Sequence, residues 1–188
     1  MFLTFIINAK IKYEKYYKNK KAKIMASKIN DEIKSLLKSK KVEEANKLLG
    51  HKFYIESPVI HGLENGRKIN FPTLNQEIEE EILPNGVYVT RTKIGDKIYK
   101  SMRNIGTHPT ISKLDKPIME THIIDFSGDI YGQIVKVEFL TYLRDQKKFP
   151  SFDDLKEQLK QDCIKAKNYQ EEWINKNSLL YLINIYFK

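Results

Sequence analysis

The sequence predicts a mainly β protein built around a closed antiparallel barrel, with helices before and after it. Three observations support this fold class. Five segments between residues 53 and 140 are rich in β-branched and aromatic residues, which favour strands. Short turn-forming stretches, such as residues 94–97 and 126–129, join neighbouring segments closely enough for antiparallel pairing. The flanking segments instead space their apolar residues at helical intervals.

The N-terminal part is expected to hold an extension and then a pair of helices. Residues 1–25 carry no clear motif and are interpreted as an irregular or weakly helical extension. A helical stripe then begins, formed by Ile29, Ile33, Leu36 and Leu37. A second short helix over residues 42–49 should end at Gly50, because glycine favours the left-handed conformation that closes many helices.

The barrel strands are expected in the middle of the chain, at residues 53–61, 86–93, 97–103, 119–126 and 131–140. In the last segment Val135 and Val137 alternate with the charged residues Lys136 and Glu138, so one face should be buried. Short strands joined by tight turns favour a closed antiparallel barrel over a parallel sheet.

A helix is expected after the barrel. Ser151 and Asp154 have the spacing of a capping box. The helix behind them carries an apolar stripe that should pack on the barrel, namely Leu155, Leu159, Cys163 and Ala166. Residues 173–188 are again rich in leucine and isoleucine and predict a further helix.

Composition restricts the classes of protein that this chain can represent. Its 188 residues, 41% of them hydrophobic, suit one globular domain with appendages. No apolar run approaches the roughly 20 residues that cross a bilayer, and residues 2–7 lack the basic flank of a signal peptide. The single cysteine, Cys163, excludes an internal disulfide and a cysteine-based metal site. We therefore expect a cytoplasmic protein with no membrane partner.

The net charge of +9 raises the alternative of a nucleic-acid-binding module. Much of the lysine excess lies in the first 41 residues, where Tyr13, Tyr16 and Tyr17 could stack on bases. A solvated helical face explains the same lysines more simply. We favour that interpretation and keep nucleic-acid binding as the weaker alternative.

Two short segments can carry phosphate chemistry. Gly62 and Gly66 can let backbone N–H groups approach phosphate oxygens, and Arg67 adds a charged donor, although two glycines at this spacing also form plain turns. Behind them Thr73 and Asn75 stand two apart on an extended segment that follows Pro72. Their hydroxyl and amide oxygens are ligands suited to Mg²⁺, although such a pair can also simply close a turn.

Glu120 is the candidate for a catalytic carboxylate. It begins an otherwise apolar strand over residues 119–126. A carboxylate there is either a surface residue on an edge strand or a base held in a cleft.

These segments belong to an ordered series of blocks. The blocks are Val59-Ile60-His61-Gly62, Gly66-Arg67, Phe71-Pro72-Thr73-Leu74-Asn75, Leu83-Pro84-Asn85-Gly86-Val87-Tyr88, Asn104-Ile105-Gly106-Thr107-His108-Pro109-Thr110, Glu120-Thr121-His122-Ile123-Ile124-Asp125-Phe126, Asp129-Ile130-Tyr131-Gly132, and Leu143-Arg144 with Lys147 and Phe149. In this order they resemble the riboflavin kinase domain found at the C-terminal end of bacterial bifunctional FAD synthetases. The resemblance covers residues 50–162.

The resemblance implies a six-stranded Greek-key barrel that transfers the γ-phosphate of ATP to the 5′-hydroxyl of riboflavin, giving FMN and ADP. It implies that Thr73 and Asn75 hold Mg²⁺ and the phosphates, and that Glu120 is the general base. The other implied nucleotide contacts are Gly62, Arg67, Ile123, Asp125 and Tyr131. The implied flavin contacts are Arg144, Lys147 and Phe149.

The chain departs from the family pattern around the glycine loop. Glu64 and Asn65 replace a Gly-Arg pair, which removes one close backbone approach and one positive charge. Asn70 replaces a glycine before Phe-Pro, and asparagine tolerates a positive φ better than other residues. Leu74 and His108 replace an alanine and an arginine. These changes predict weaker ATP affinity, and they keep open the alternative of a catalytically weakened flavin-binding remnant.

Residues 26–50 resemble the helical end of the FMN adenylyltransferase module that precedes this kinase domain in the family. The His-x-Gly-His nucleotide signature of that module is absent from the sequence. The expected organisation is therefore an extension (1–25), a helical remnant of that module (26–50), the kinase barrel and helix (51–170) and a tail (171–188). We expect no FAD synthesis, a separate FMN adenylyltransferase as partner, and an origin in a split gene, a late start or a truncation.

Overall fold

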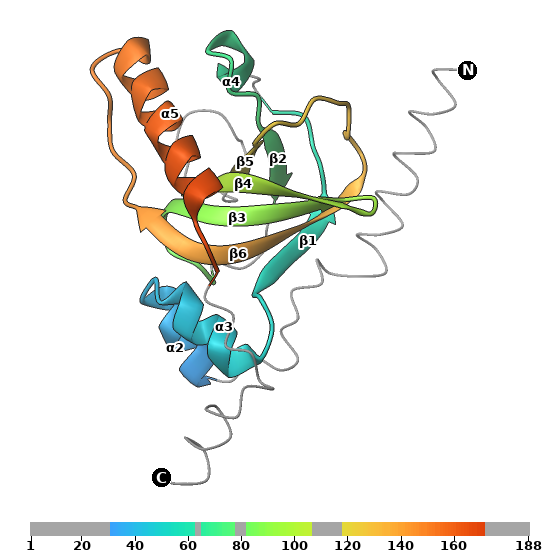
Figure 1. Cartoon of the computed structure of the whole chain (residues 1–188), viewed down its shortest axis with the longest axis vertical. Coiled ribbons are helices and arrows are strands. Elements are labelled where there is room, and N and C mark those ends of the chain that lie inside the picture. Colours follow the sequence, from blue (N-terminus) through green and yellow to red (C-terminus); the bar gives the residue numbers. More distant parts are fainter. Residues whose placement is uncertain (1–30, 63–64, 78–81, 107–117, 172–188) are drawn as a thin grey trace, which may run out of the picture.

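The computed structural model describes residues 31–62, 65–77, 82–106 and 118–171. Within them one antiparallel sheet has the strand order β1-β6-β3-β4-β5-β2. Its strands are β1 (Tyr54–Pro58), β2 (Leu74–Glu77), β3 (Gly86–Ile94), β4 (Lys97–Gly106), β5 (Ile118–Ile123) and β6 (Ile134–Arg144). An isolated bridge between Ile60 and Asn75 joins the two edges of the sheet. The nearly closed, six-stranded antiparallel barrel confirms the predicted fold class (Figure 1).

Strand β2 is the element that sequence pattern alone did not identify. Leu74–Glu77 contains no β-branched or aromatic residue, and it is a strand because β5 pairs with all four of its residues. Several predicted strand limits were wrong as well. β1 ends at Pro58 rather than at residue 61, β4 continues to Gly106 rather than ending at residue 103, and β6 continues to Arg144 rather than ending at residue 140. β5 ends at Ile123 because the chain turns at Asp125, whose φ is 57°, and β6 begins at Ile134 rather than at residue 131.

Four helices lie in the described part of the chain: α2 (Asp31–Lys38), α3 (Val42–Leu49), α4 (Asn65–Lys68) and α5 (Phe152–Asn168). The end of α3 is as predicted, since Gly50 has a φ of 74° and donates its N–H to the carbonyl of Asn46. The cap of α5 is confirmed too, because Ser151 Oγ accepts a hydrogen bond of 3.1 Å from the N–H of Asp154. The predicted extension (1–25) and the helix predicted at residues 173–188 lie outside the described residues. No helix in the described ranges is long and apolar enough to cross a membrane.

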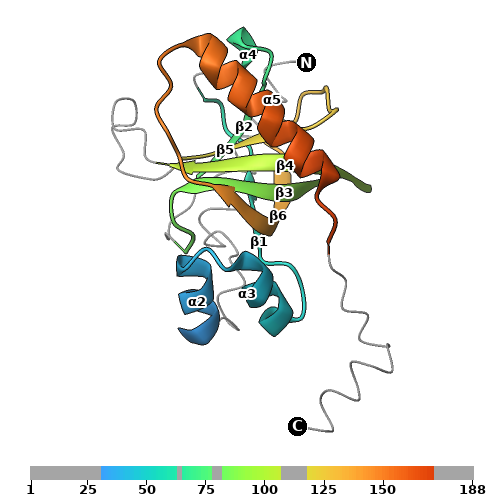
Figure 2. The same ribbon diagram turned by 60° about the vertical axis from the view of Figure 1, so that its left-hand side comes forward.

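The helical hairpin α2–α3 shares one core with the barrel. It buries Ile33, Leu37, Val42 and Ala45 against barrel side chains that include Phe53 and Phe139. Asn46 fastens α3 in place, because its side chain donates 2.9 Å to the carbonyl of Phe139 and accepts 2.7 Å from the N–H of Phe53. Figure 2 shows the hairpin on one side of the barrel and α5 on the other, as does Figure 1.

Helix α5 covers the outer face of the central strands. Cys163, Ala166 and Leu159 of its predicted stripe pack with Val89, Met102 and Leu140. The sheet therefore has a core on each face.

The barrel interior contains a buried cation. Arg103 is 0% exposed, and its guanidinium donates to Thr121 Oγ1 at 2.7 Å and to the side-chain oxygen of Gln76. Gln76 in turn donates to the backbone carbonyls of Ser57 and Val135. Because these partners are neutral, burial lowers the pKa of Arg103 to about 9. The network links β2, β4 and β5, the strands that carry the candidate site.

Candidate active site

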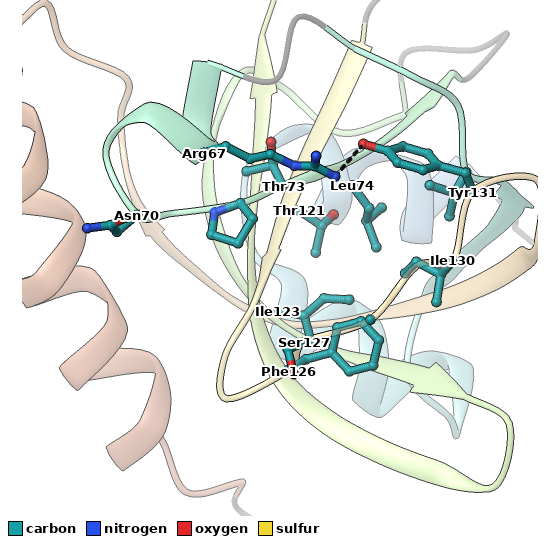
Figure 3. A pocket seen from close by; sticks show the side chains of 13 residues that line it. Arg67, Asn70, Thr73, Leu74, Thr121, Ile123, Phe126, Ser127, Ile130 and Tyr131 are labelled. Carbon is teal, nitrogen blue, oxygen red and sulfur yellow. Dashed lines mark hydrogen bonds between the residues drawn. The ribbon is translucent and has the colours of Figure 1, made fainter.

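A cavity of about 450 Å³ opens where β2, β5 and the segment 124–133 meet (Figure 3). Its apolar walls are formed by Val59, Pro72, Leu74, Ile123, Phe126 and Ile130. Arg67, Thr73 and Tyr131 add polar groups to the lining. Four residues predicted to bind a nucleotide therefore line one cavity, namely Arg67, Thr73, Ile123 and Tyr131.

The chain reaches this cavity through the tight turn around α4. A Cβ on Gly66 would lie 2.2 Å from the carbonyl oxygen of Phe71, so only glycine fits there without a shift. Phe71 closes the turn by donating its N–H to the Gly66 carbonyl at 2.8 Å. Asn70 has a φ of 62°, which confirms that asparagine supports the left-handed turn here. The other substituted positions Glu64 and His108 lie outside the described residues.

Tyr131, which lines the cavity, stacks on a second aromatic ring. The rings of His61 and Tyr131 stack with their centroids 3.7 Å apart. Arg67 donates to the Tyr131 hydroxyl across 3.4 Å, a long hydrogen bond that joins α4 to the segment after β5. Figure 3 shows this bond along one edge of the cavity.

A row of polar residues crosses β2, β5 and β4 on the face opposite to Leu74, Thr121 and Ile123, which line the cavity. Asn75 of β2 is the cross-strand partner of Glu120 of β5, and Glu120 is also the partner of Asn104 of β4. Successive residues along one strand point to opposite faces of the sheet. Met119 and Thr121, directly before and after Glu120, are both 0% exposed. Glu120 therefore projects from the other face, together with Asn75 and Asn104.

The position of Glu120 bears on one of its two interpretations, that of a surface residue on an edge strand. β5 is paired on both sides, by β2 and β4, so Glu120 does not stand on an edge strand. It is only partly exposed and lies between two amide side chains, one of which (Asn75) is 4% exposed. Glu120 is therefore not a surface residue on an edge strand, and its role as a base stays a prediction.

Gly62 controls the position of Asn75. A Cβ at residue 62 would lie 2.2 Å from Asn75 Nδ2 and 2.6 Å from Asn75 Cγ. The backbone of the first predicted phosphate loop is therefore in direct contact with the Asn75 amide. Neither Gly62 nor Asn75 is part of the cavity lining, although Thr73 and Leu74, just before Asn75, are.

Asp125, the remaining predicted nucleotide residue, lies away from the cavity lining. It is exposed, and its carboxylate pairs with Lys167 of α5 at 2.8 Å. The turn that contains it nevertheless leads directly into Phe126, Ser127 and Gly128, which do line the cavity.

The predicted flavin residues lie around a loop at residues 145–151, between β6 and α5, that we call the acceptor loop. Arg144 is held by Asp162, which is 0% exposed, with its Nη2 2.7 Å from Oδ2 and its Nε 2.9 Å from the same oxygen. Lys147 Nζ lies 5.2 Å from the centroid of the Phe149 ring. Gln146 donates to Asn104 Oδ1 at 2.6 Å. The acceptor loop is thus tied to the polar row that contains Glu120.

Sequence reasoning missed His122, which supports the Phe-Pro-Thr stretch. Its Nδ1 lies 2.8 Å from the carbonyl oxygen of Pro72, and its ring lies 5.1 Å from that of Phe71. Burial lowers the pKa of His122, so the neutral ring is favoured and can donate its Nδ1–H to Pro72. The signal was present in the sequence, since residues 120 and 122 share a face of any strand.

The residues present fit a magnesium ion bound together with phosphate. Thr73 and Asn75 offer a hydroxyl and an amide oxygen, which are hard ligands, and Gly62 holds the Asn75 amide close to the first loop. Within the described ranges no group of three His, Cys, Asp or Glu side chains could hold a metal. A Mg²⁺ ion held by the Thr73 and Asn75 oxygens would take further ligands from water and phosphate oxygens.

Comparison with known proteins gives the class of this chain. A family model described as riboflavin kinase (Flavokinase) matches residues 49–170, more than half of the chain. This match places the chain in a family of kinases. More specifically, the chain belongs to the riboflavin kinase family.

Curated relatives match the same region. A bifunctional riboflavin kinase/FMN adenylyltransferase of Haemophilus influenzae is 40% identical over 139 residues, covering 73% of this chain and 45% of that protein. One of Bacillus subtilis is 34% identical over 141 residues, with the same coverage of 73% and 45%. The chain thus spans less than half the length of these relatives.

A solved structure has the same fold. It is described as a macrolide-efflux protein from Streptococcus pneumoniae and superposes with a TM-score of 0.68 at 34% identity. The match covers 76% of this chain and 47% of that one.

Proposed function

We propose that this chain transfers the γ-phosphate of ATP to the 5′-hydroxyl of riboflavin, giving FMN and ADP. The observation that carries the proposal is the row Asn75–Glu120–Asn104, which runs from the nucleotide side of the site to the acceptor loop. Direct transfer between two bound substrates requires a proton acceptor between them, held in fixed geometry. The family match supports the same reaction.

The cavity is proposed to bind the nucleotide. Its apolar walls suit a purine ring, while Arg67 and Thr73 supply a charged donor and a hydroxyl for phosphate oxygens. Ile123 and Tyr131 contribute lining for the nucleoside. Gly62 contributes through its backbone, and Asp125 through the turn beside the cavity.

Thr73 and Asn75 are proposed to hold Mg²⁺ with the phosphates. When bound, the ion neutralises charge on the transferring phosphoryl group. The pairing of β2 with β5 and the contact of Gly62 with Asn75 support this role for Asn75, and Thr73 lies directly before β2 in the cavity lining.

Glu120 is proposed as the general base. Its carboxylate accepts the proton of the 5′-hydroxyl as that oxygen bonds to the γ-phosphorus, and ADP leaves with the electron pair of the broken P–O bond. Phosphoryl transfer depends mainly on positioning and charge neutralisation. The paired strands on both sides of Glu120 supply that rigidity.

The acceptor loop is proposed to hold the flavin. Lys147 and Phe149 offer a cation and an aromatic face to the isoalloxazine ring. Arg144, predicted as a direct contact, has its guanidinium bound to Asp162, so we propose that it acts by fixing the start of the loop.

The proposal is tested by incubating the purified chain with riboflavin and ATP, with and without Mg²⁺, and separating the flavins by chromatography. We expect FMN and ADP in equal amounts, dependent on Mg²⁺, and no FAD. A separate FMN adenylyltransferase is then the proposed partner for the next step. Riboflavin binding without FMN formation would instead support the weakened flavin-binding remnant.

A further inference from the structure

Lys40 occupies a backbone position that normally favours glycine. It follows α2 in a Schellman motif, in which Lys41 N–H donates 2.9 Å to the Leu36 carbonyl and Lys40 N–H donates 3.0 Å to that of Leu37. The φ of Lys40 is 63°, in the left-handed region, where a side chain costs stability relative to glycine. A strained residue at such a position suggests that its side chain has a use elsewhere.

The Lys40 side chain reaches across to the end of β6. Its Nζ donates to the Tyr142 hydroxyl at 3.1 Å, lies 4.6 Å from the centroid of that ring and contacts the Asp145 carboxylate. More than 100 residues separate Lys40 from both partners. The hydrogen bond to Asp145 raises the pKa of Lys40, and the same bond lowers the pKa of Asp145, so both groups stay charged near neutral pH.

Asp145 is the first residue of the acceptor loop. The residue before it, Arg144, is bound to the buried Asp162, and the residue after it, Gln146, is bound to Asn104. Three successive residues are therefore fastened to three different parts of the fold: α5, the helical hairpin and β4. Lys147, the first proposed flavin contact, comes immediately afterwards.

The helical hairpin α2–α3, which carries Lys40, is itself fixed to the barrel. Its apolar residues share a core with the barrel, and Asn46 bonds to the backbone of both Phe53 and Phe139. Figure 2 shows the hairpin against the barrel side opposite α5, so the acceptor loop is held from both sides.

We propose that Lys40 is a positioning residue for the acceptor substrate: it holds Asp145 so that the loop presents Lys147 and Phe149 to the flavin. This inference rests on the proposed riboflavin kinase function. It makes the helical hairpin a working part of the acceptor site, rather than only a remnant of a preceding module.

Lys40→Gly separates positioning from stability. The variant removes the ammonium group and relieves the left-handed strain, so its Tm should stay equal or rise. Because an exposed ion pair contributes modestly, the Kd and KM for riboflavin should each rise by about two- to fivefold. The KM for ATP should not change. Riboflavin Kd is measured by quenching of flavin fluorescence, which needs no turnover.

Two further variants make the test specific. Lys41→Met removes the same charge from a neighbour whose ammonium pairs with Glu44 inside the hairpin, and it should leave riboflavin Kd unchanged. Lys40→Arg keeps a cation and should retain most of the wild-type affinity.

The outcomes distinguish the inference from the proposed function. Equal riboflavin Kd values for wild type and Lys40→Gly would overturn the inference, whether or not the wild type makes FMN. A fall in Tm with unchanged Kd would assign Lys40 a merely structural role. A wild-type chain that neither binds riboflavin nor forms FMN overturns both proposals.

Discussion

Asn75 and Glu120 are direct cross-strand partners in the β2–β5 pair, and both project from the same face of the sheet. One belongs to the Phe-Pro-Thr-Leu-Asn stretch that leads out of the nucleotide turn. The other has Asn104 on its far side, and Asn104 is bonded to the acceptor loop. The proposed metal ligand and the proposed base, 45 residues apart in the sequence, thus become neighbours through strand pairing alone.

Thr73→Ala should damage the use of Mg·ATP more than the use of riboflavin. Losing a hydrogen bond or ligand to a charged group costs about 1.5–3 kcal/mol, which corresponds to a rise of about 10- to 100-fold in KM for Mg·ATP. Thr73→Ser keeps the hydroxyl and should stay close to wild type. Steady-state kinetics over a Mg²⁺ titration measure the effect, and full activity of Thr73→Ala at low Mg²⁺ would remove Thr73 from the metal site.

Gly62→Ala should impair catalysis because its Cβ would overlap the Asn75 amide, with only 2.2 Å to Nδ2. The new methyl group must push Asn75 away from its place opposite Glu120. Gly95→Ala is the matched control: no atom lies within 4 Å of its Cβ, but its φ of 58° strains the backbone. The control should lose stability and keep its kcat, whereas Gly62→Ala should lose kcat. Equal kcat values in the two variants would contradict this role of Gly62.

Asp162→Asn should destabilise the protein, because it leaves the largely buried Arg144 guanidinium without its carboxylate. Breaking a buried pair from one side costs about 3–5 kcal/mol, and we expect the lower end because Arg144 is 18% exposed. Urea unfolding measures the change. Glu157→Gln on the exposed face of α5 should shift the free energy of unfolding by less than about 0.5 kcal/mol. A similar small shift in Asp162→Asn would show that the pair does not anchor the loop.

Stability should fall on mild acidification partly through His122. Burial lowers its pKa in the folded state, so the unfolded chain, with an ordinary value of about 6.5, takes up the proton first. The free energy of unfolding therefore decreases as pH falls from about 6.5 toward the lowered folded value. Urea titrations at several pH values should show a weaker dependence in His122→Gln. An identical dependence in both proteins would assign the effect to other groups.

Much of the fold was predictable from local pattern. Alternation located β3, β4 and β6, helical spacing located the hairpin, and Gly50 and Ser151 marked helix ends. β2 was missed because Leu74–Glu77 has no strand-forming residues and exists through its pairing with β5. Local sequence carries no information about such a partner.

Some features of the candidate site were predicted from the sequence and others were not. Thr73, Arg67, Ile123 and Tyr131 were predicted and share one cavity. Two contacts were not predicted, because each joins residues far apart in the sequence. Gln146 and Asn104 are 42 residues apart, and Lys40 and Asp145 are 105 residues apart. Those contacts depend on strand register and on where the hairpin packs, which only the folded structure supplies.

The most direct test of the account compares FMN formation by wild type and Glu120→Gln. The substitution keeps the size of the side chain and one accepting oxygen, and it removes the ability to accept the proton. We predict that kcat falls by about 10²- to 10⁴-fold while the Kd for riboflavin is unchanged. FMN formation by Glu120→Gln at the wild-type rate would contradict the assignment of Glu120 as the base.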